Sequence, residues 1–229
     1  MNWRQRYAME QQHYDKLQGT AEKFFGSGGS VDVHHIGAKT EIDPIKADYL
    51  KGQKALIDQQ LDGCVLNSAR HLALTGLSRA LGGLHQLYST GSHEGLPEEL
   101  WSVGSGHPTQ ALLAKDKDNN VVGHLTTFDM PKNQTGGAPA SGVIGTGSLS
   151  SGAGTALQHT FVHHVSSGQG LNSTIYDQAG PVQDDARKFH DSIGRNVEGL
   201  NSWWNTSDIA GIKSNTTPVP GAAITHIGK

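Results

Sequence analysis

Cys64, His159 and Asp177 are the residues whose types and spacing best suit nucleophilic catalysis. Cys64 is the one cysteine of the chain, and the apolar sequence after it predicts a helix with the thiol in its first turn. Free N–H groups and the helix dipole stabilise a thiolate at such a position. A thiolate also needs a base and an acceptor that orients the base. Because His159 and Asp177 are predicted to lie on neighbouring antiparallel strands, we expect them to supply both functions.

Other histidines offer alternatives to this arrangement. His163 shares the predicted strand face of His159 by the period of two, so it is the alternative base. Asp32, His34 and His35 resemble a metal cluster, but adjacent histidines on a strand point to opposite faces, and no zinc-binding motif supports them. We therefore expect no metal ion and no other cofactor.

The elements that would position these residues change in character along the chain. Apolar residues recur every three or four positions in the first third, and the pattern after it is closer to a period of two. The patterns predict helices at residues 3–25, 44–61, 65–88 and 184–204, and strands at 30–36, 111–114, 121–128, 157–165, 174–176 and 222–227. Helices first and antiparallel strands afterwards are typical of the α+β class.

Residues 136–154 are rich in Gly, Ser and Ala, which cannot pack a core, so we expect a long surface loop there. Residues 142–147 contain the pattern G-x-x-G-x-G, but no strand is predicted before it and no apolar helix after it, so the pattern does not predict a nucleotide site. We assign residues 1–40 to an N-terminal helical extension and residues 41–229 to one globular catalytic domain.

The composition of the 229 residues excludes several classes of protein. Eighteen Lys and Arg against 21 Asp and Glu give a net charge of −3, so no global basic field exists to hold nucleic acid. No stretch approaches the ~18 apolar residues of a membrane helix. The first residues lack the apolar segment of a secretory signal peptide. We therefore expect a protein that is cytoplasmic or is exported without such a signal.

The candidate residues resemble the motifs of papain-like cysteine peptidases, in which a Cys on a helix is followed by His and Asp or Asn on a sheet. The segments 62–64 (DGC), 159–162 (HTFV) and 175–180 (IYDQAG) are similar to those of YopT/AvrPphB-type bacterial effector peptidases. NlpC-type amidases and papain-like deamidases share this order. The resemblance implies a papain-like α+β fold, in which N-terminal helices pack the Cys helix on an antiparallel sheet. It also implies Gln60 as a side-chain donor to the oxyanion.

The function that this resemblance implies is a cysteine hydrolase that cleaves or deamidates an amide bond in a protein or in peptidoglycan. Cys64 would attack the amide carbon, His159 would protonate the leaving amine, and Asp177 would fix the histidine tautomer. The resemblance further implies a bacterial effector or toxin with a cognate inhibitor or immunity protein. Two other functions stay open: a non-enzymatic binding or structural module with a buried cysteine, and a His/Asp metallohydrolase.

Overall fold

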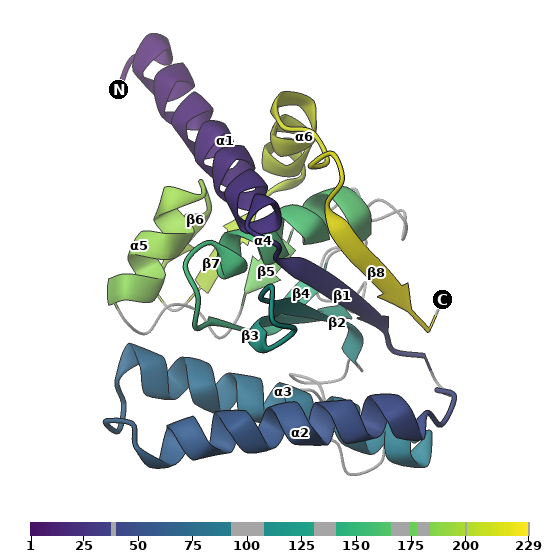
Figure 1. Cartoon of the computed structure of the whole chain (residues 1–229). Coiled ribbons are helices and arrows are strands. Elements are labelled where there is room, and N and C mark those ends of the chain that lie inside the picture. Colours follow the sequence, from purple (N-terminus) through teal and green to yellow (C-terminus); the bar gives the residue numbers. More distant parts are fainter. Residues whose placement is uncertain are drawn as a thin grey trace.

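An eight-stranded mixed sheet connects nearly all parts of the chain in the computed structural model (Figure 1). The structure describes residues 1–37, 40–92, 108–130, 141–165, 175–177, 184–199 and 201–228, and for residues 144, 145 and 175–177 the backbone alone. Within these ranges the strands are β1 (Ser30–His35), β2 (Pro108–Lys115), β3 (Val121–Asp129), β4 (Ser141–Ser148), β5 (Ile175–Asp177), β6 (Asn196–Glu198), β7 (Asn201–Trp204) and β8 (Ala223–Ile227). Their order in the sheet is β6-β7-β5-β4-β3-β2-β1-β8.

Helices cover both faces of this sheet (Figure 1). They are α1 (Trp3–Gly26), α2 (Pro44–Asp62), α3 (Ala69–Thr90), α4 (Ala153–Thr160), which a π-helical turn at Phe161–Val165 continues, α5 (Asp184–Ser192) and α6 (Thr206–Asn215). No helix within the described ranges is both long enough and apolar enough to cross a lipid bilayer.

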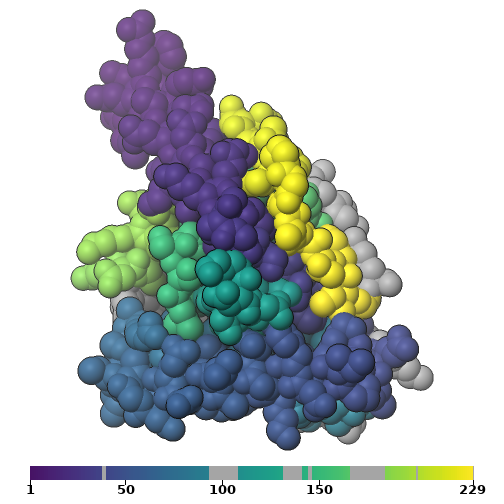
Figure 2. Space-filling model, in the orientation of Figure 1, coloured from purple at the N-terminus to yellow at the C-terminus, as the bar shows by residue number. Residues whose placement is uncertain are grey.

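Two apolar cores result, one on each face of the sheet. The first lies between the sheet and α1, α4 and α6, and the second lies between the sheet and the pair α2 and α3. Alternation along β2 explains the division, because Leu112 and Ala114 belong to the first core while Ala111 and Leu113 belong to the second. In Figure 2 α2 and α3 form a continuous layer along the bottom of the molecule, and the N-terminal half of α1 lies at the opposite end.

Several predicted elements are confirmed, as is the α+β class. The helices predicted at residues 3–25 and 44–61 correspond to α1 and α2, and Asp43 caps α2 by accepting a hydrogen bond from the Lys46 amide at 3.0 Å. The strands predicted at 30–36, 121–128 and 222–227 correspond to β1, β3 and β8. The expected domain boundary at residue 40 stays a prediction, although β1 pairs with both β2 and β8 in the common sheet.

The papain-like version of the α+β class is wrong, because the sheet is mixed. β4 runs parallel to β5, and β1 runs parallel to β8. The surface loop predicted at residues 136–154 is also wrong where the structure describes it, since β4 and the start of α4 occupy residues 141–154. Glycine serves close packing in β4: a Cβ at Gly142 would overlap the ring of Phe128. Residues 131–140 lie outside the described part of the chain.

The strand predicted at residues 157–165 is a helix in the structure. Every residue of α4 is buried, so the helix has no polar face and its sequence shows no period of 3.6 residues. β-branched and aromatic residues add to the likeness of a strand. The helix predicted at residues 184–204 is shorter in the structure, because α5 ends at Ser192. Gly194 follows with φ +77° and turns the chain into the β6–β7 hairpin.

Candidate functional site

Cys64 lies in the connection between α2 and α3, and not in the first turn of a helix. Ser68 caps α3, because its hydroxyl accepts a hydrogen bond from the His71 amide at 3.1 Å. The Cys64 amide donates to the Leu61 carbonyl at 3.0 Å, so it closes the end of α2 and is not free to hold an oxyanion. The half-buried thiol lies 3.7 Å from the Ser68 hydroxyl and packs on the second core.

His159 lies on the other face of the sheet. It belongs to α4, is 1% exposed, and its Nε2 lies 3.0 Å from the Thr217 carbonyl and 3.3 Å from the Gln18 amide oxygen. His163, on the π-helical turn, has its Nε2 2.7 Å from the Thr216 hydroxyl. Burial is the main cause that lowers the pKa of each imidazole to about 4. These histidines are therefore neutral packing groups under α1 and the 216–217 segment.

The remaining predicted residues do not join Cys64 to His159 either. Gln60 is exposed on α2, where its side chain accepts from Arg70 at 2.7 Å. The backbone of Asp177 pairs with Val143 of β4 and Ser202 of β7, and its side chain lies outside the described part. Because the sheet separates the thiol from His159 and His163, the structure does not bring the predicted triad together.

The metal cluster considered at the start of the chain is divided in the same way. Asp32 forms an ion pair with Lys115 at 2.7 Å, and His34 lies 2.9 Å from the Tyr88 hydroxyl in the second core. His35 stacks on His226, with Nε2 and Nδ1 2.9 Å apart. In the residues that the structure describes, no three His, Cys, Asp or Glu side chains converge as metal ligands.

The neighbouring strands β4 and β5 offer a different site. They run parallel, but their pairing is limited to Ser141–Val143 on β4 and Ile175–Asp177 on β5. β4 then continues to Ser148 with β3 as its partner on one side. Within the described ranges, the other edge of β4 has no partner strand beyond Val143. An unpaired edge presents a row of backbone N–H and C=O groups that an extended molecule can bind.

A β-bulge lies at the point where this edge opens. Thr126 of β3 pairs with Gly145 and Thr127 pairs with Val143, so the backbone of Ile144 has no opposite residue. Such a bulge rotates a backbone group out of the ladder, and bulges occur often beside active sites.

The N-terminus of α4 follows β4 after four residues. Gly152, with φ +83°, is its N-cap, and no side chain caps the helix. The Ala153 amide donates to the Ser150 carbonyl at 3.2 Å. The amides of Gly154 and Thr155 donate to no group in the described part of the chain, although both residues are buried. The N–H groups and the dipole at a helix start both favour negative charge.

These features were missed at the level of sequence, although the signal was present. The segment Gly152-Ala153-Gly154 stands between a glycine-rich stretch and an apolar one, which is the order of a strand, a tight turn and a helix. The G-x-x-G-x-G pattern at residues 142–147 lies within β4 itself, and the apolar helix that the sequence did not predict follows it as α4.

Comparison with known proteins adds one distant similarity. No family model matches the sequence, and no curated protein matches it. A solved structure that matches is that of a mutant AtaT toxin bound to the C-terminus of the antitoxin AtaR. The two chains share 14% sequence identity, the match covers 79% of this chain and 95% of that chain, and the TM-score is 0.44. A similarity this distant carries no functional conclusion for the chain.

The cysteine-hydrolase prediction is therefore wrong. The sheet lies between Cys64, which packs on the second core, and the predicted bases His159 and His163, which lie with the first core. The related prediction of an effector peptidase or NlpC-type amidase is wrong for the same reason. The AtaT structure contains a bound antitoxin, whereas the expected inhibitor of this chain stays a prediction.

Proposed function

We propose that the chain is an N-acyltransferase that binds an acyl-CoA thioester between β4 and β5. The observation that carries the proposal is the edge of β4 beyond Val143, which has no partner strand among the described residues and leads through a glycine turn into the N-terminus of α4. An arm with amide groups can add to such an edge as a strand does, and a diphosphate suits the helix N-terminus. Coenzyme A joins these two groups directly, since its two-amide arm ends on a diphosphate.

The reaction that follows is direct transfer to an amine. The amine nitrogen attacks the thioester carbonyl, a C–N bond forms, the C–S bond breaks, the nitrogen loses a proton and CoA leaves as a thiol once it takes up a proton. The bulge at Ile144 lies on the edge along which the arm binds. A backbone N–H freed there would stabilise the negative charge on the carbonyl oxygen.

The packing beneath β4 supports a rigid platform for this step. His124 of β3 is 4% exposed, and burial lowers its pKa to about 4, so the ring is neutral at pH 7. A Cβ at Gly147 would lie 3.2 Å from His124 Nε2 and 3.3 Å from the Ala73 backbone. Glycine at this position lets β4 lie directly on β3 and α3, where its open edge keeps a fixed place.

A charge placed at the start of α4 tests CoA binding. Ser151 is exposed, one residue before the N-cap. In the variant Ser151→Asp, the carboxylate repels the diphosphate, while its negative charge near the helix N-terminus does not lower the stability of the fold. We expect the Kd for acetyl-CoA to rise at least about tenfold, which corresponds to about 1.4 kcal/mol. The uncharged variant Ser151→Asn is the matched control, with a Kd close to that of the unchanged chain.

Activity is measured by the release of free CoA thiol from acetyl-CoA in the presence of amine acceptors, and by mass spectrometry of proteins for the gain of an acetyl group. Ser151→Asp should lower both signals and Ser151→Asn should not. The proposal fails if acetyl-CoA does not bind at millimolar concentration, or if Ser151→Asp binds it as tightly as Ser151→Asn.

A further inference from the structure

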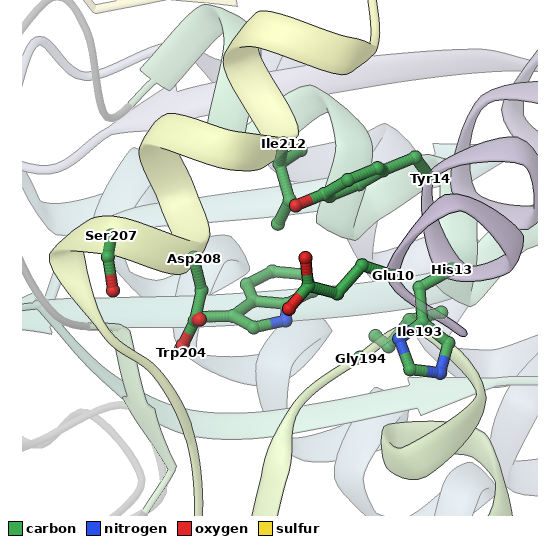
Figure 3. Close-up of a pocket in the computed structure, with 9 residues that line it drawn as sticks. All are labelled: Glu10, His13, Tyr14, Ile193, Gly194, Trp204, Ser207, Asp208 and Ile212. Carbon is green, nitrogen blue, oxygen red and sulfur yellow. The ribbon is translucent and has the colours of Figure 1, made fainter. Parts of the chain in front are cut away.

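A cavity of about 260 Å³ lies between α1, the turn before β6, the end of β7 and α6, at a place that the proposed function does not use. Figure 3 shows its lining, with Glu10 and Tyr14 on α1, Trp204 at the end of β7 and Asp208 on α6. It is at the lower limit of ligand pockets, which span roughly 300–1,000 Å³. The cavity therefore suits a small group or a single side chain.

The charge in the cavity is negative. Glu10 is exposed on α1, and its carboxylate forms no hydrogen bond or ion pair with any residue that the structure describes. Asp208 uses one carboxylate oxygen, Oδ2, to accept from the Asn205 amide at 2.7 Å and from Asn196 at 3.2 Å. Lys and Arg do not occur in the lining, where His13 is the one other titratable side chain besides Tyr14.

The aromatic groups complete a lining for a cation. In Figure 3 the Trp204 ring lies near the Asp208 carboxylate with the Glu10 carboxylate drawn over it, and all three line the cavity together with Tyr14. Burial and the charges of Glu10 and Asp208 raise the pKa of Tyr14, which reports the negative potential around its oxygen. Arg195 packs on Trp204, with 4.9 Å from Cζ to the ring centroid, and it is directed to Ser202 and Gln158 in the core.

The walls of the cavity are held in place by glycines where α1 contacts the rest of the fold. A Cβ at Gly211 of α6 would overlap the Tyr14 hydroxyl, and a Cβ at Gly194 would lie 2.7 Å from His13 Nδ1. Gly194 also has φ +77°, which other residues rarely adopt. Gly194 is therefore favoured by its backbone conformation, whereas a side chain at Gly211 would require the Tyr14 hydroxyl to shift.

We propose that this cavity binds an aliphatic ammonium group, held by the Glu10 and Asp208 carboxylates against the rings of Trp204 and Tyr14. An ammonium ion forms charge-assisted hydrogen bonds with carboxylates and is attracted to the faces of aromatic rings. A neutral or anionic group of the same size lacks both interactions. The proposal does not rest on the acyltransferase function, because none of its residues belongs to β4 or α4.

The test compares putrescine, which has two ammonium groups, with 1,4-butanediol, its neutral analogue, by isothermal titration calorimetry on the full chain. We expect putrescine to bind and butanediol to bind at least about tenfold more weakly, since butanediol lacks the charge-assisted hydrogen bonds to the carboxylates. An ammonium group can come from a protein lysine or from a free amine, and a blocked Gly-Lys-Gly peptide distinguishes these two sources. If the peptide binds, a protein lysine is a ligand; if putrescine alone binds, the ligand is a free amine.

Variants locate the binding. Glu10→Gln should weaken putrescine binding about tenfold without loss of stability, because the Glu10 carboxylate forms no hydrogen bond or ion pair with the described residues. Asp208→Asn should weaken it similarly and still cap α6, because the amide oxygen can accept the Asn205 hydrogen bond. Asp15→Asn, which removes the same charge from α1 outside the cavity, is the control and should change the Kd less than twofold. Three results would overturn the proposal. They are equal binding of putrescine and butanediol, no binding of putrescine or of the lysine peptide, and equal effects of Glu10→Gln and Asp15→Asn on the Kd.

Discussion

Gly142 pairs with Phe128 across β4 and β3, and the Phe128 ring covers the place that a side chain at Gly142 would occupy. Phe128 is 2% exposed, so the ring cannot move into solvent to make room. Gly52, in the middle of α2, is the opposite case, because nothing lies within 4 Å of its Cβ position. The same residue type therefore has a packing role in one element and none in the other.

Substitution by alanine should separate these two roles. Gly142→Ala forces the Phe128 ring aside, and we expect it to lower the free energy of unfolding by about 1–3 kcal/mol. Gly52→Ala should raise it by about 0.5–1 kcal/mol, because glycine lowers the stability of a helix interior. Urea unfolding measures both changes. Equal stability of Gly142→Ala and the unchanged chain would contradict the packing of β4 on Phe128.

Cys64 should be dispensable for acyl transfer. The proposed reaction is a direct attack of the amine on the thioester, and the thiol lies on the α2–α3 side of the sheet, packed on the second core. We expect Cys64→Ala to change the rate of CoA release from acetyl-CoA by less than about twofold, a change that corresponds to less than 1 kcal/mol of transition-state free energy. Ser151→Asp serves as the inactive comparison. A loss of activity in Cys64→Ala as large as in Ser151→Asp would favour a covalent intermediate on the thiol.

At the scale of elements, the amphipathic helices and most strands, β5 among them, were predictable, whereas β4 and α4 beside the candidate site were not. α1 and α2 each bury one face, so their apolar residues recur with the period of a helix. α4 is buried on all sides and β4 has glycine where rings and backbone press on it, so neither shows the expected period. Local sequence cannot reveal such burial, because α4 is covered by α1, β2 and β3, which lie far from it in the chain.

The start of α3 is an element-scale feature with a direct test. Ser68→Ala removes the acceptor for the His71 amide and leaves it unpaired. We expect a loss of about 1 kcal/mol in the free energy of unfolding, the usual cost of an N-cap serine. Ser89→Ala removes an exposed hydroxyl that bonds to the His85 carbonyl near the other end of the helix, and it should cost less than half as much. Equal losses in the two variants would mean that α3 does not begin at Ser68.

At the scale of the whole molecule, several histidines, among them the predicted base His159, are buried within the fold. His34, His124, His159 and His190 are each between 1% and 4% exposed. His190 lies 2.6 Å from the Ser202 hydroxyl beneath Arg195, and burial followed by the Arg195 charge lowers its pKa to about 3. The sequence shows that histidines are numerous, but their burial depends on the assembled layers, so their role could not be predicted from it.

These four histidines should make the fold sensitive to acid. Burial is the main cause that lowers their pKa values to about 3 for His34 and His190 and to about 4 for His124 and His159. The unfolded chain, with histidine pKa values of about 6.5, takes up protons first as the pH falls, so the stabilisation is complete above about pH 6.5 and declines below it. At pH 5 each of these histidines should have lowered the free energy of unfolding by about 2 kcal/mol. The sum for the four histidines is roughly the whole stability of an ordinary domain.

Urea unfolding at pH 7.5 and pH 5 measures this loss, and one variant assigns part of it. His124→Gln cannot take up a proton, so its loss between the two pH values should be smaller than that of the unchanged chain by about 2 kcal/mol, whatever its stability at pH 7.5. His85→Gln, on the half-buried side of α3, is the control for a histidine outside the cores. If His124→Gln and the unchanged chain lose the same free energy, the His124 imidazole is protonated in the folded state, and the ring beneath β4 carries a charge that the acyl-CoA site would have to accommodate.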